Sequence, residues 1–352
     1  MVLSRLYLDH AATTPMLPRA RAAVAEAMER WANPSSPHAE GRAARAALED
    51  ARARIAAALG HSGALIFTSG ASEAIEIAMR RGKAARRMLS AVEHDAVRRV
   101  ARDAAILPVD RLGQVHEDAV GGADTLHAIQ LVNNETGVVQ PIDALRERIA
   151  ERGGLLLMDA AQAAGKMPLP GADFVSISAH KLGGPPGIGA LLIRDLGLIE
   201  PSGGQEQGYR GGTENLPAIM GFAAALEESI AWTARASRLR DRLDSAIRDG
   251  GGMVVADEAR RAPAIASYRM PGVAATAQLI RFDMAGISVS AGSACSSGSL
   301  KPSHVLAAMG WSEAEAREVV RVSFGPQTEE ADIDRFVSEW HKVAASARTR
   351  AA

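Results

Sequence analysis

Short apolar runs alternate along the chain with longer stretches in which apolar residues recur at helical spacing. The helical spacing predicts helices over residues 20–31, 39–59 and 73–79. The apolar runs predict strands over residues 64–67, 87–90, 127–132, 155–158, 174–178 and 189–193. Several of these runs are apolar on both faces, which is typical of buried parallel strands. The pattern therefore predicts an α/β protein with a mainly parallel central sheet.

The second half of the chain has a different pattern. A helical repeat extends from residue 216 to about residue 247 and ends at the glycine cluster 250–252. The remainder, residues 264–352, is patterned as a smaller α/β unit. A chain of 352 residues has room for about two domains, so we expect the long helical stretch to lead from one to the other.

Composition and charge exclude several classes of protein. Hydrophobic residues make up 47% of the chain, and 40 Lys and Arg residues balance 41 Asp and Glu residues. This balance predicts no binding to nucleic acid or to an acidic membrane. No apolar run approaches the ~18 residues of a membrane helix, and the start of the chain is charged too soon for a secretion signal. The default expectation is a cytoplasmic enzyme.

The single cysteine, Cys295, limits the kinds of site that the chain can form. One cysteine excludes an internal disulfide framework and a cysteine-rich metal cage within one chain, so we expect no metal site. The residue lies among serine and glycine, in Ala291-Gly292-Ser293-Ala294-Cys295-Ser296-Ser297-Gly298. A buried, inert cysteine usually has apolar neighbours. These flanks instead favour a loop in which the thiol is available for reaction.

A lysine at the end of a predicted strand is the first candidate for catalysis. The strand over residues 174–178 runs into Ser178-Ala179-His180-Lys181 and then into a turn rich in glycine and proline. A lysine fixed beside other cofactor contacts can form a Schiff base with a carbonyl cofactor. Taken alone, the same string also fits a plain lysine at a strand end.

Four other strand ends carry polar groups that suit one cofactor site. Thr68-Ser69-Gly70-Ala71-Ser72-Glu73 opens a helix where backbone N–H groups can bind phosphate, although it also fits a capped helix start. Asp159 can pair with a protonated pyridine nitrogen, and Gln162 can donate to a ring oxygen. His94 can stack on a flat ring, and the amides of residues 133–134 can reach a ring hydroxyl. The alternatives are an exposed carboxylate, a surface histidine and an Asn-rich turn.

The order of these motifs carries more information than any one of them. The chain resembles the class V aminotransferase group of pyridoxal-phosphate enzymes, and within it the cysteine desulfurases. The matching motifs are, in chain order, Tyr7-Leu8-Asp9-His10-Ala11-Ala12-Thr13-Thr14-Pro15, Asn33-Pro34-Ser35-Ser36, Thr68-Ser69-Gly70-Ala71-Ser72-Glu73, Glu93-His94, Asn133-Asn134-Glu135, Asp159-Ala160-Ala161-Gln162, Ser178-Ala179-His180-Lys181, Arg210-Gly211-Gly212-Thr213-Glu214-Asn215, Gly292-Ser293-Ala294-Cys295-Ser296-Ser297 and Arg321-Val322-Ser323-Phe324-Gly325.

The resemblance implies the fold and the cofactor site. It implies fold type I of the pyridoxal-phosphate-dependent transferases, with a large cofactor-binding domain over residues 13–232. A small domain over residues 1–12 and 233–352 would carry the cysteine loop. Lys181 would hold pyridoxal 5'-phosphate as a Schiff base, and His94 would stack on the ring and serve in acid–base catalysis. The other implied cofactor contacts are Ala71, Ser72, Asn134, Asp159, Gln162, Ser178, Ala179, His180 and Thr213.

The resemblance also implies a reaction and partners. Arg321, helped by Asn33, would bind the carboxylate of the substrate L-cysteine, since a guanidinium binds carboxylates through two parallel hydrogen bonds. Cys295 would take the substrate sulfur as a persulfide, leaving L-alanine, and pass the sulfur to an acceptor such as an iron–sulfur scaffold or a thiolation carrier. Thr213 would reach the cofactor phosphate of a neighbouring subunit, which implies a homodimer with shared active sites.

Two departures from the family pattern leave alternatives open. Pro186 stands where many relatives have lysine, and the chain is shortened after about residue 336, where relatives extend toward the scaffold partner. One alternative is a selenocysteine lyase that uses the same cofactor without needing Cys295. Another is a catalytically idle protein that binds pyridoxal phosphate for regulation. The retention of Lys181, Asp159, Arg321 and Cys295 argues against the idle protein. The segment Gly292-Ser293-Ala294-Cys295-Ser296-Ser297, with the single cysteine of the chain, favours a desulfurase over the lyase.

Overall fold

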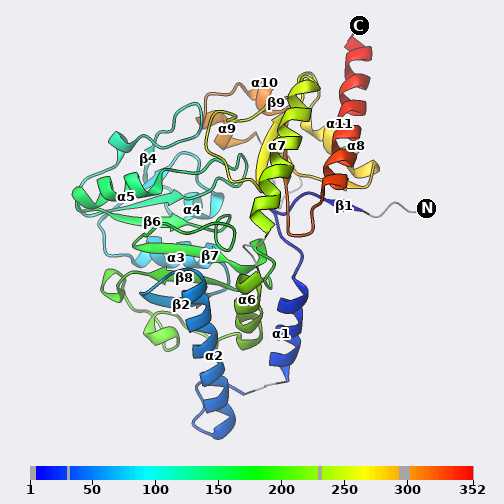
Figure 1. Cartoon of the computed structure of the whole chain (residues 1–352). Coiled ribbons are helices and arrows are strands. Elements are labelled where there is room, and N and C mark those ends of the chain that lie inside the picture. The colour runs from blue at the N-terminus through cyan, green and yellow to red at the C-terminus, as the bar shows by residue number, and fades with distance from the viewer. Residues whose placement is uncertain (1–4, 30–31, 229–231, 293–301, 352) are drawn as a thin grey trace.

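A seven-stranded sheet forms the centre of the larger part of the molecule (Figure 1). The computed structural model describes residues 5–29, 32–228, 232–292 and 302–351. Strand β8 runs antiparallel to both of its neighbours, and every other pair of neighbours in this sheet is parallel. In spatial order the strands are β2 (Ala64–Thr68), β8 (Gly189–Ile193), β7 (Phe174–Ser178), β6 (Leu155–Asp159), β5 (Thr125–Gln130), β3 (Arg86–Ser90) and β4 (Ala105–Leu107).

Helices cover both faces of this sheet because alternate side chains of each strand point to opposite faces. On β2, Leu65 and Phe67 pack in one core cluster, and Ile66 packs in another. The first cluster lies under helices α2 (Ala39–Ala58), α5 (Ile142–Glu151) and α6 (Leu216–Glu228), with α1 (Pro18–Met28) packed on α6. The second lies under α3 (Ala71–Arg81) and α4 (Asp95–Val100). Strands β5, β7 and β8 are therefore buried at every position, as the sequence predicted for several strands.

The smaller part of the molecule, here called the C-terminal part, consists of two small sheets and three helices that cover them, and it also includes the N-terminal strand β1. Strands β12 (Val319–Ser323), β10 (Ile265–Arg269) and β9 (Met253–Val254) form one sheet, and β1 (Leu6–Tyr7) pairs with β11 (Ile287–Ser288) in another. The covering helices are α7 (Thr233–Asp249), α8 (Ala275–Met284) and α11 (Glu330–Ala351), and the short helices α9 (His304–Ala308) and α10 (Glu313–Ala316) lie between strands β11 and β12 in the chain.

Aromatic side chains fill the core of the C-terminal part. Phe282 of α8 stacks on Phe336 of α11 with ring centroids 5.0 Å apart, and Trp340 packs against both rings. Tyr268 of β10 packs edge-on against Trp340 and donates a 2.6 Å hydrogen bond to Asp244 of α7. All four rings are buried, and burying rings of this size is a large apolar contribution to stability.

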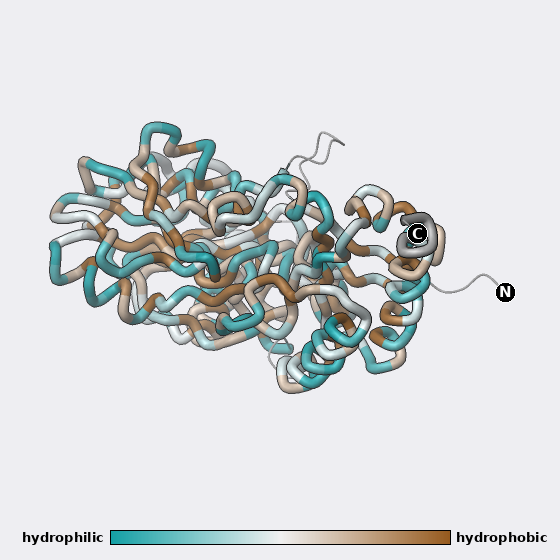
Figure 2. Tube along the Cα trace, turned by 90° about the horizontal axis from the view of Figure 1, so that it is seen from above, coloured by the Kyte–Doolittle hydropathy of each residue, from teal (hydrophilic) through white to brown (hydrophobic). Residues whose placement is uncertain are grey.

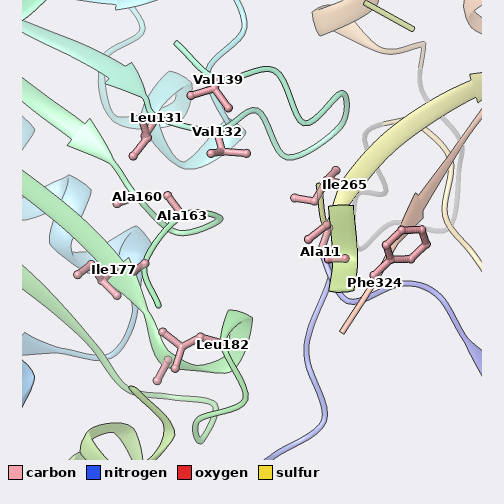
Figure 3. Close-up of a cluster of buried hydrophobic side chains, with 14 of the residues drawn as sticks. Ala11, Leu131, Val132, Val139, Ala160, Ala163, Ile177, Leu182, Ile265 and Phe324 are labelled. Carbon is pink, nitrogen blue, oxygen red and sulfur yellow. The ribbon is translucent and has the colours of Figure 1, made fainter. Parts of the chain in front are cut away.

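The two parts share one continuous core. Figure 3 shows Leu131, Ala160 and Ile177 at the carboxyl-terminal side of the large sheet, facing Ile265 and Phe324 from the C-terminal part. Apolar residues lie mainly in the interior (Figure 2). Across the described ranges every helix is too short or too polar to cross a bilayer. The expected domain limits, at residues 12/13 and 232/233, stay predictions.

Most predicted elements are confirmed, and the differences have local causes. The predicted strand over residues 127–132 ends at Gln130, because Asn133 turns the chain by accepting hydrogen bonds from the backbone N–H groups of Glu135 and Thr136. The pattern over residues 216–247 forms two helices, α6 and α7, on either side of residues 229–231. The edge strand β4 was not predicted, since it has three residues and Ile106 is exposed.

Candidate active site

A cavity of about 470 Å³ opens at the carboxyl ends of the parallel strands. Ligands of open α/β sheets bind at this edge, because the loops that leave the strands converge there. The cavity brings together ten of the residues singled out from the sequence: Ala71, Ser72, His94, Asn134, Asp159, Gln162, Ser178, His180, Lys181 and Arg321. Residues far apart in the chain thus form one wall.

The other four predicted residues are not part of this wall. Ala179 is fully buried behind it, and its backbone N–H donates to Ile188. Asn33 and Thr213 are exposed on the surface of the chain. Cys295 lies outside the described residues, between Gly292, which lines the cavity, and helix α9.

Lys181 presents an amine held by the N-terminal segment. Its Nζ donates hydrogen bonds to the carbonyl oxygens of Ala11 and Ala12, both at 2.7 Å. Burial, followed by the positive charge of Arg321, lowers the pKa of Lys181 to about 8. A lysine with this pKa has a substantial neutral fraction near neutral pH, and only the neutral amine attacks a carbonyl group.

Asp159 is a carboxylate fixed at the end of strand β6. Its Oδ1 accepts hydrogen bonds from the Ser176 hydroxyl at 3.1 Å and from the Ala161 N–H at 2.9 Å. The residue is buried, yet it lines the cavity. A carboxylate in this position can pair with a cationic ring nitrogen of a bound molecule.

His94 also lines the cavity, and it is the N-cap residue of helix α4. Its Nδ1 accepts a 3.1 Å hydrogen bond from the Ala96 N–H, so in the neutral ring the proton lies on Nε2. Burial lowers the pKa of His94. A neutral imidazole therefore borders the cavity, and a neutral ring can stack on a flat ligand without a charge to desolvate.

The turn before helix α3 is shaped to receive an anion. Gly70 precedes the helix with φ 154°, and as the N-cap residue it has no side chain to cap the first N–H groups. The turn packs so closely on β8 that a Cβ at Gly189 would lie 2.6 Å from the Gly70 Cα. Glu73 fixes the turn by accepting from the Ser69 N–H at 2.5 Å and from Arg210 at 2.8 Å. The backbone N–H groups at Ala71 and Ser72, in the first turn of the helix and beside the cavity, suit a phosphate.

Gln162 is oriented by two neighbours. Its Nε2 donates to the Ala11 carbonyl at 2.8 Å, and its Oε1 accepts from the Lys166 amine at 3.4 Å. Burial lowers the pKa of Lys166 to about 7. Sequence reasoning missed Lys166, although its spacing of four residues from Gln162 was a signal that the two side chains share a face.

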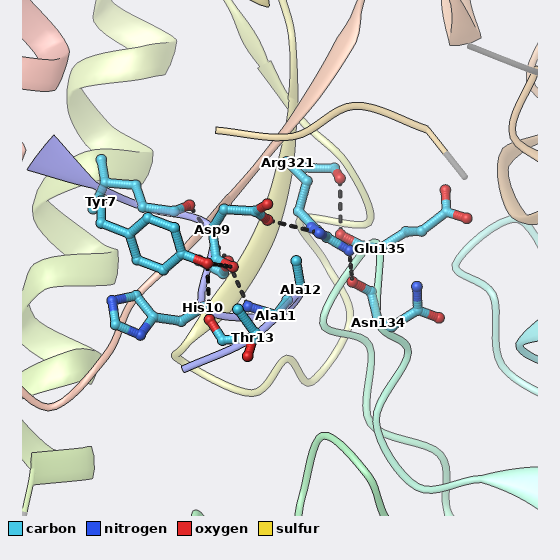
Figure 4. A network of polar contacts seen from close by, with 12 residues as sticks. Tyr7, Asp9, His10, Ala11, Ala12, Thr13, Asn134, Glu135 and Arg321 are labelled. Carbon is cyan, nitrogen blue, oxygen red and sulfur yellow. Dashed lines mark hydrogen bonds and ion pairs between the residues drawn. The ribbon is translucent and has the colours of Figure 1, made fainter. Parts of the chain in front are cut away.

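Arg321 lies on the side of the cavity formed by the C-terminal part (Figure 4). Its NH2 contacts the Asp9 carboxylate at 2.8 Å, and its NH1 donates to the Asn134 carbonyl at 2.9 Å. The side chain is 7% exposed. Sequence reasoning singled out the motif that contains Asp9 but gave that residue no role, since only the fold brings it to Arg321.

Comparison with known proteins identifies the group to which this arrangement belongs. The family Aminotransferase class-V matches residues 6–336. The chain is 35% identical to the cysteine desulfurase IscS 1 of Archaeoglobus fulgidus over 94% of each chain. A structure of a NifS-like protein from Rickettsia africae ESF-5 superposes with a TM-score of 0.88 at 30% identity, covering 96% of this chain and 99% of the other.

A further solved structure, described as SspA in complex with cysteine, superposes with a TM-score of 0.79 at 30% identity. It covers 92% of this chain and all of the other. The central sheet, the order of the motifs and these likenesses agree with one another. The chain belongs to the class V aminotransferases and, within them, to the cysteine desulfurases.

Proposed function

We propose that this protein converts L-cysteine to L-alanine and receives the sulfur on Cys295 as a persulfide. The observation that carries the proposal is the meeting of three groups in one cavity: the amine of Lys181, the carboxylate of Asp159 and the guanidinium of Arg321. An amino acid substrate needs a site for its carboxylate, and its reaction needs an amine and an electron-withdrawing centre. The relatives named above are called cysteine desulfurases.

The residues of the cavity fit pyridoxal 5'-phosphate, the cofactor of this family. The uncapped start of helix α3 would hold the phosphate, Asp159 would pair with the ring nitrogen, and Gln162 would donate to the ring oxygen. Lys181 would hold the cofactor covalently, and His94 would lie against the ring. When bound, the cofactor supplies an electron sink for the negative charge that develops at the substrate α-carbon.

The chain's own groups orient the substrate and move its proton. Arg321 binds the carboxylate, because its guanidinium lines the cavity and is held in place by Asp9 and the Asn134 carbonyl. Lys181, once released by the substrate amine, takes the proton from the α-carbon on its neutral Nζ and returns it later in the reaction. The neutral His94 imidazole adds no competing positive charge to this side of the cavity.

Sulfur transfer requires a nucleophile that the cavity wall does not contain. Cys295, which follows the cavity residue Gly292 by three positions, is the only thiol of the chain. Its thiolate attacks the substrate sulfur, so an S–S bond forms as the C–S bond breaks. The electron pair of the C–S bond stays on the carbon, which takes up a proton and becomes the methyl group of alanine.

The proposal extends to a homodimer and to a sulfur acceptor. Thr213 and Asn33 are exposed rather than part of the cavity in their own chain, and a role for both is explained if they act at the site of a second copy. The turn that presents Thr213 is held by the hydrogen bond between the Gly212 N–H and Gln205, at 3.0 Å.

We propose that the persulfide passes in the cytoplasm to an acceptor protein, such as an iron–sulfur scaffold or a thiolation carrier.

The test is an assay of alanine and sulfide from L-cysteine with purified protein and pyridoxal phosphate. We expect alanine from the wild type in the presence of a thiol reductant, and none from Lys181→Ala or Cys295→Ala. Alanine formation that survives Cys295→Ala would favour a lyase that releases sulfur without a persulfide. No product from the wild type, despite bound yellow cofactor, would contradict the proposal.

A further inference from the structure

The N-terminal segment, residues 7–14, is built into the cavity wall although the reaction assigns it no task. Its carbonyl oxygens at Ala11 and Ala12 hold the Lys181 amine, and the Ala11 carbonyl also holds Gln162. The Tyr7 hydroxyl lies 3.0 Å from the carbonyl oxygen of Asp9 and 2.9 Å from that of Thr13, and it donates its one proton to either of them. The segment is therefore fixed in shape, and any side chain that it directs at the cavity has a defined position.

The backbone of this segment is attached to the strand that carries Arg321. The Ser323 N–H donates to the Leu8 carbonyl at 2.8 Å, and the Ala11 N–H donates to the Ser323 hydroxyl at 2.9 Å. Asp9 itself forms a parallel bridge with Ser323, two residues beyond Arg321. The register between the two segments thus fixes Asp9 beside Arg321 through the backbone as well as through the side chains.

Asp9 and the Asn134 carbonyl hold the Arg321 guanidinium from two directions. Asp9 Oδ1 contacts NH2 at 2.8 Å, and the Asn134 oxygen accepts from NH1 at 2.9 Å, as Figure 4 shows. Arg321 lines the cavity, and each terminal nitrogen has a second N–H group besides the one that Asp9 or Asn134 accepts. These N–H groups can pair with the carboxylate of a ligand.

We propose that Asp9 is a substrate-positioning residue: it holds one terminal nitrogen of Arg321 and so directs the unused N–H groups of the guanidinium at the carboxylate of the bound amino acid. Asp9 acts through Arg321 and need not touch the substrate. The inference rests on the proposed function, in which Arg321 binds the substrate carboxylate. It gives the Tyr7-to-Thr14 motif a chemical reason, because the carboxylate of residue 9 holds Arg321 while the carbonyls of residues 11 and 12 hold Lys181 at the same cavity.

The test measures the binding of 3-mercaptopropionate to the protein with cofactor bound, by calorimetry. This probe has the carboxylate and the thiol of the substrate but lacks the amine that would react with the cofactor. Asp9→Ala removes the acceptor, and we expect about tenfold weaker binding. Asp9→Asn keeps an oxygen for Arg321 and removes a negative charge, so we expect affinity equal to or above that of the wild type. The KM for L-cysteine should follow the same order, with kcat within about threefold of the wild type.

Matched variants separate this inference from the proposed function. Asp334→Asn removes an aspartate whose partner, Arg242, is half exposed, and should leave binding unchanged. Arg321→Lys should weaken binding whatever the role of Asp9; if it does not, the carboxylate site is wrong. If Arg321→Lys weakens binding while Asp9→Ala binds like the wild type, or while Asp9→Asn is as weak as Asp9→Ala, the positioning role of Asp9 is overturned.

Discussion

Glu93 is a buried carboxyl group whose ionisation should control the stability of the protein at alkaline pH. The side chain is fully buried next to His94, and its Oε1 accepts from the Gln130 N–H at 2.8 Å. Its Oε2 has no partner among the described residues. Burial, with repulsion from Asp159 as a smaller cause, raises the pKa of Glu93 from 4.5 to about 8.

The size of the effect of Glu93 on the free energy of unfolding follows from this pKa. Between pH 4.5 and pH 8 the folded state binds a proton that the unfolded state has lost, so the free energy of unfolding falls as the pH rises. A rise in pKa from 4.5 to about 8 corresponds to about 5 kcal/mol, at 1.36 kcal/mol for each unit. The stability that the protonated Glu93 side chain contributes, relative to the ionised one, is fully present below pH 4.5 and is lost as the pH rises through about 8.

The perturbation is Glu93→Gln, which has the size of the protonated acid and cannot ionise. The free energy of unfolding by urea should exceed that of the wild type by about 1 kcal/mol at pH 5 and by about 4.5 kcal/mol at pH 8.5. Other titrating groups are common to both proteins and cancel in the difference. Glu76→Gln, at an exposed helical ion pair, is the control and should show no such trend. Curves of stability against pH that run parallel for the variant and the wild type would refute the reasoning.

Two further predictions concern packing and charge around the cavity, and urea unfolding checks both. Glu206→Gln should cost about 3 kcal/mol, because Glu206 is buried, contacts Arg52 at 2.7 Å and accepts from the Phe67 N–H at 2.8 Å; a loss as small as that of Asp334→Asn would contradict this. Gly189→Ala should cost about 3 kcal/mol, because the added Cβ would lie 2.3 Å from the Ile177 carbonyl oxygen. Gly122→Ala, where nothing lies within 4 Å, is its control, and equal losses in the two variants would show that the sheet yields at Gly189.

The sequence predicted what depends on local pattern. The strands over residues 174–178 and 189–193 match β7 and β8 at both ends, because each is a run of apolar residues bounded by a polar or glycine-rich turn. The groups at strand ends, such as Asp159 and Lys181, were found because parallel strands bring their carboxyl ends to one edge of a sheet. The order of the motifs along the chain then indicated one cofactor site.

What the sequence did not predict depends on contacts between distant segments. The Asp9–Arg321 pair joins residues 312 positions apart, and the parallel bridge between Asp9 and Ser323 brings them together. The pKa shifts of Lys166 and Glu93 could not be predicted, since the burial that lowers the pKa of one and raises that of the other exists only in the folded chain. The antiparallel direction of β8 was equally hidden, because a buried strand is apolar in either direction.

The most direct test of the central claim is to follow the sulfur atom itself. The purified protein, with cofactor bound, is incubated without reductant with one equivalent of L-cysteine labelled with ³⁵S. The peptide that contains Cys295 is then isolated. The account predicts that the label is bound to Cys295, is removed by a thiol reductant, and appears together with an equal amount of alanine. Alanine formed in the same amount with all of the label released as free sulfide, and none on Cys295, would contradict it.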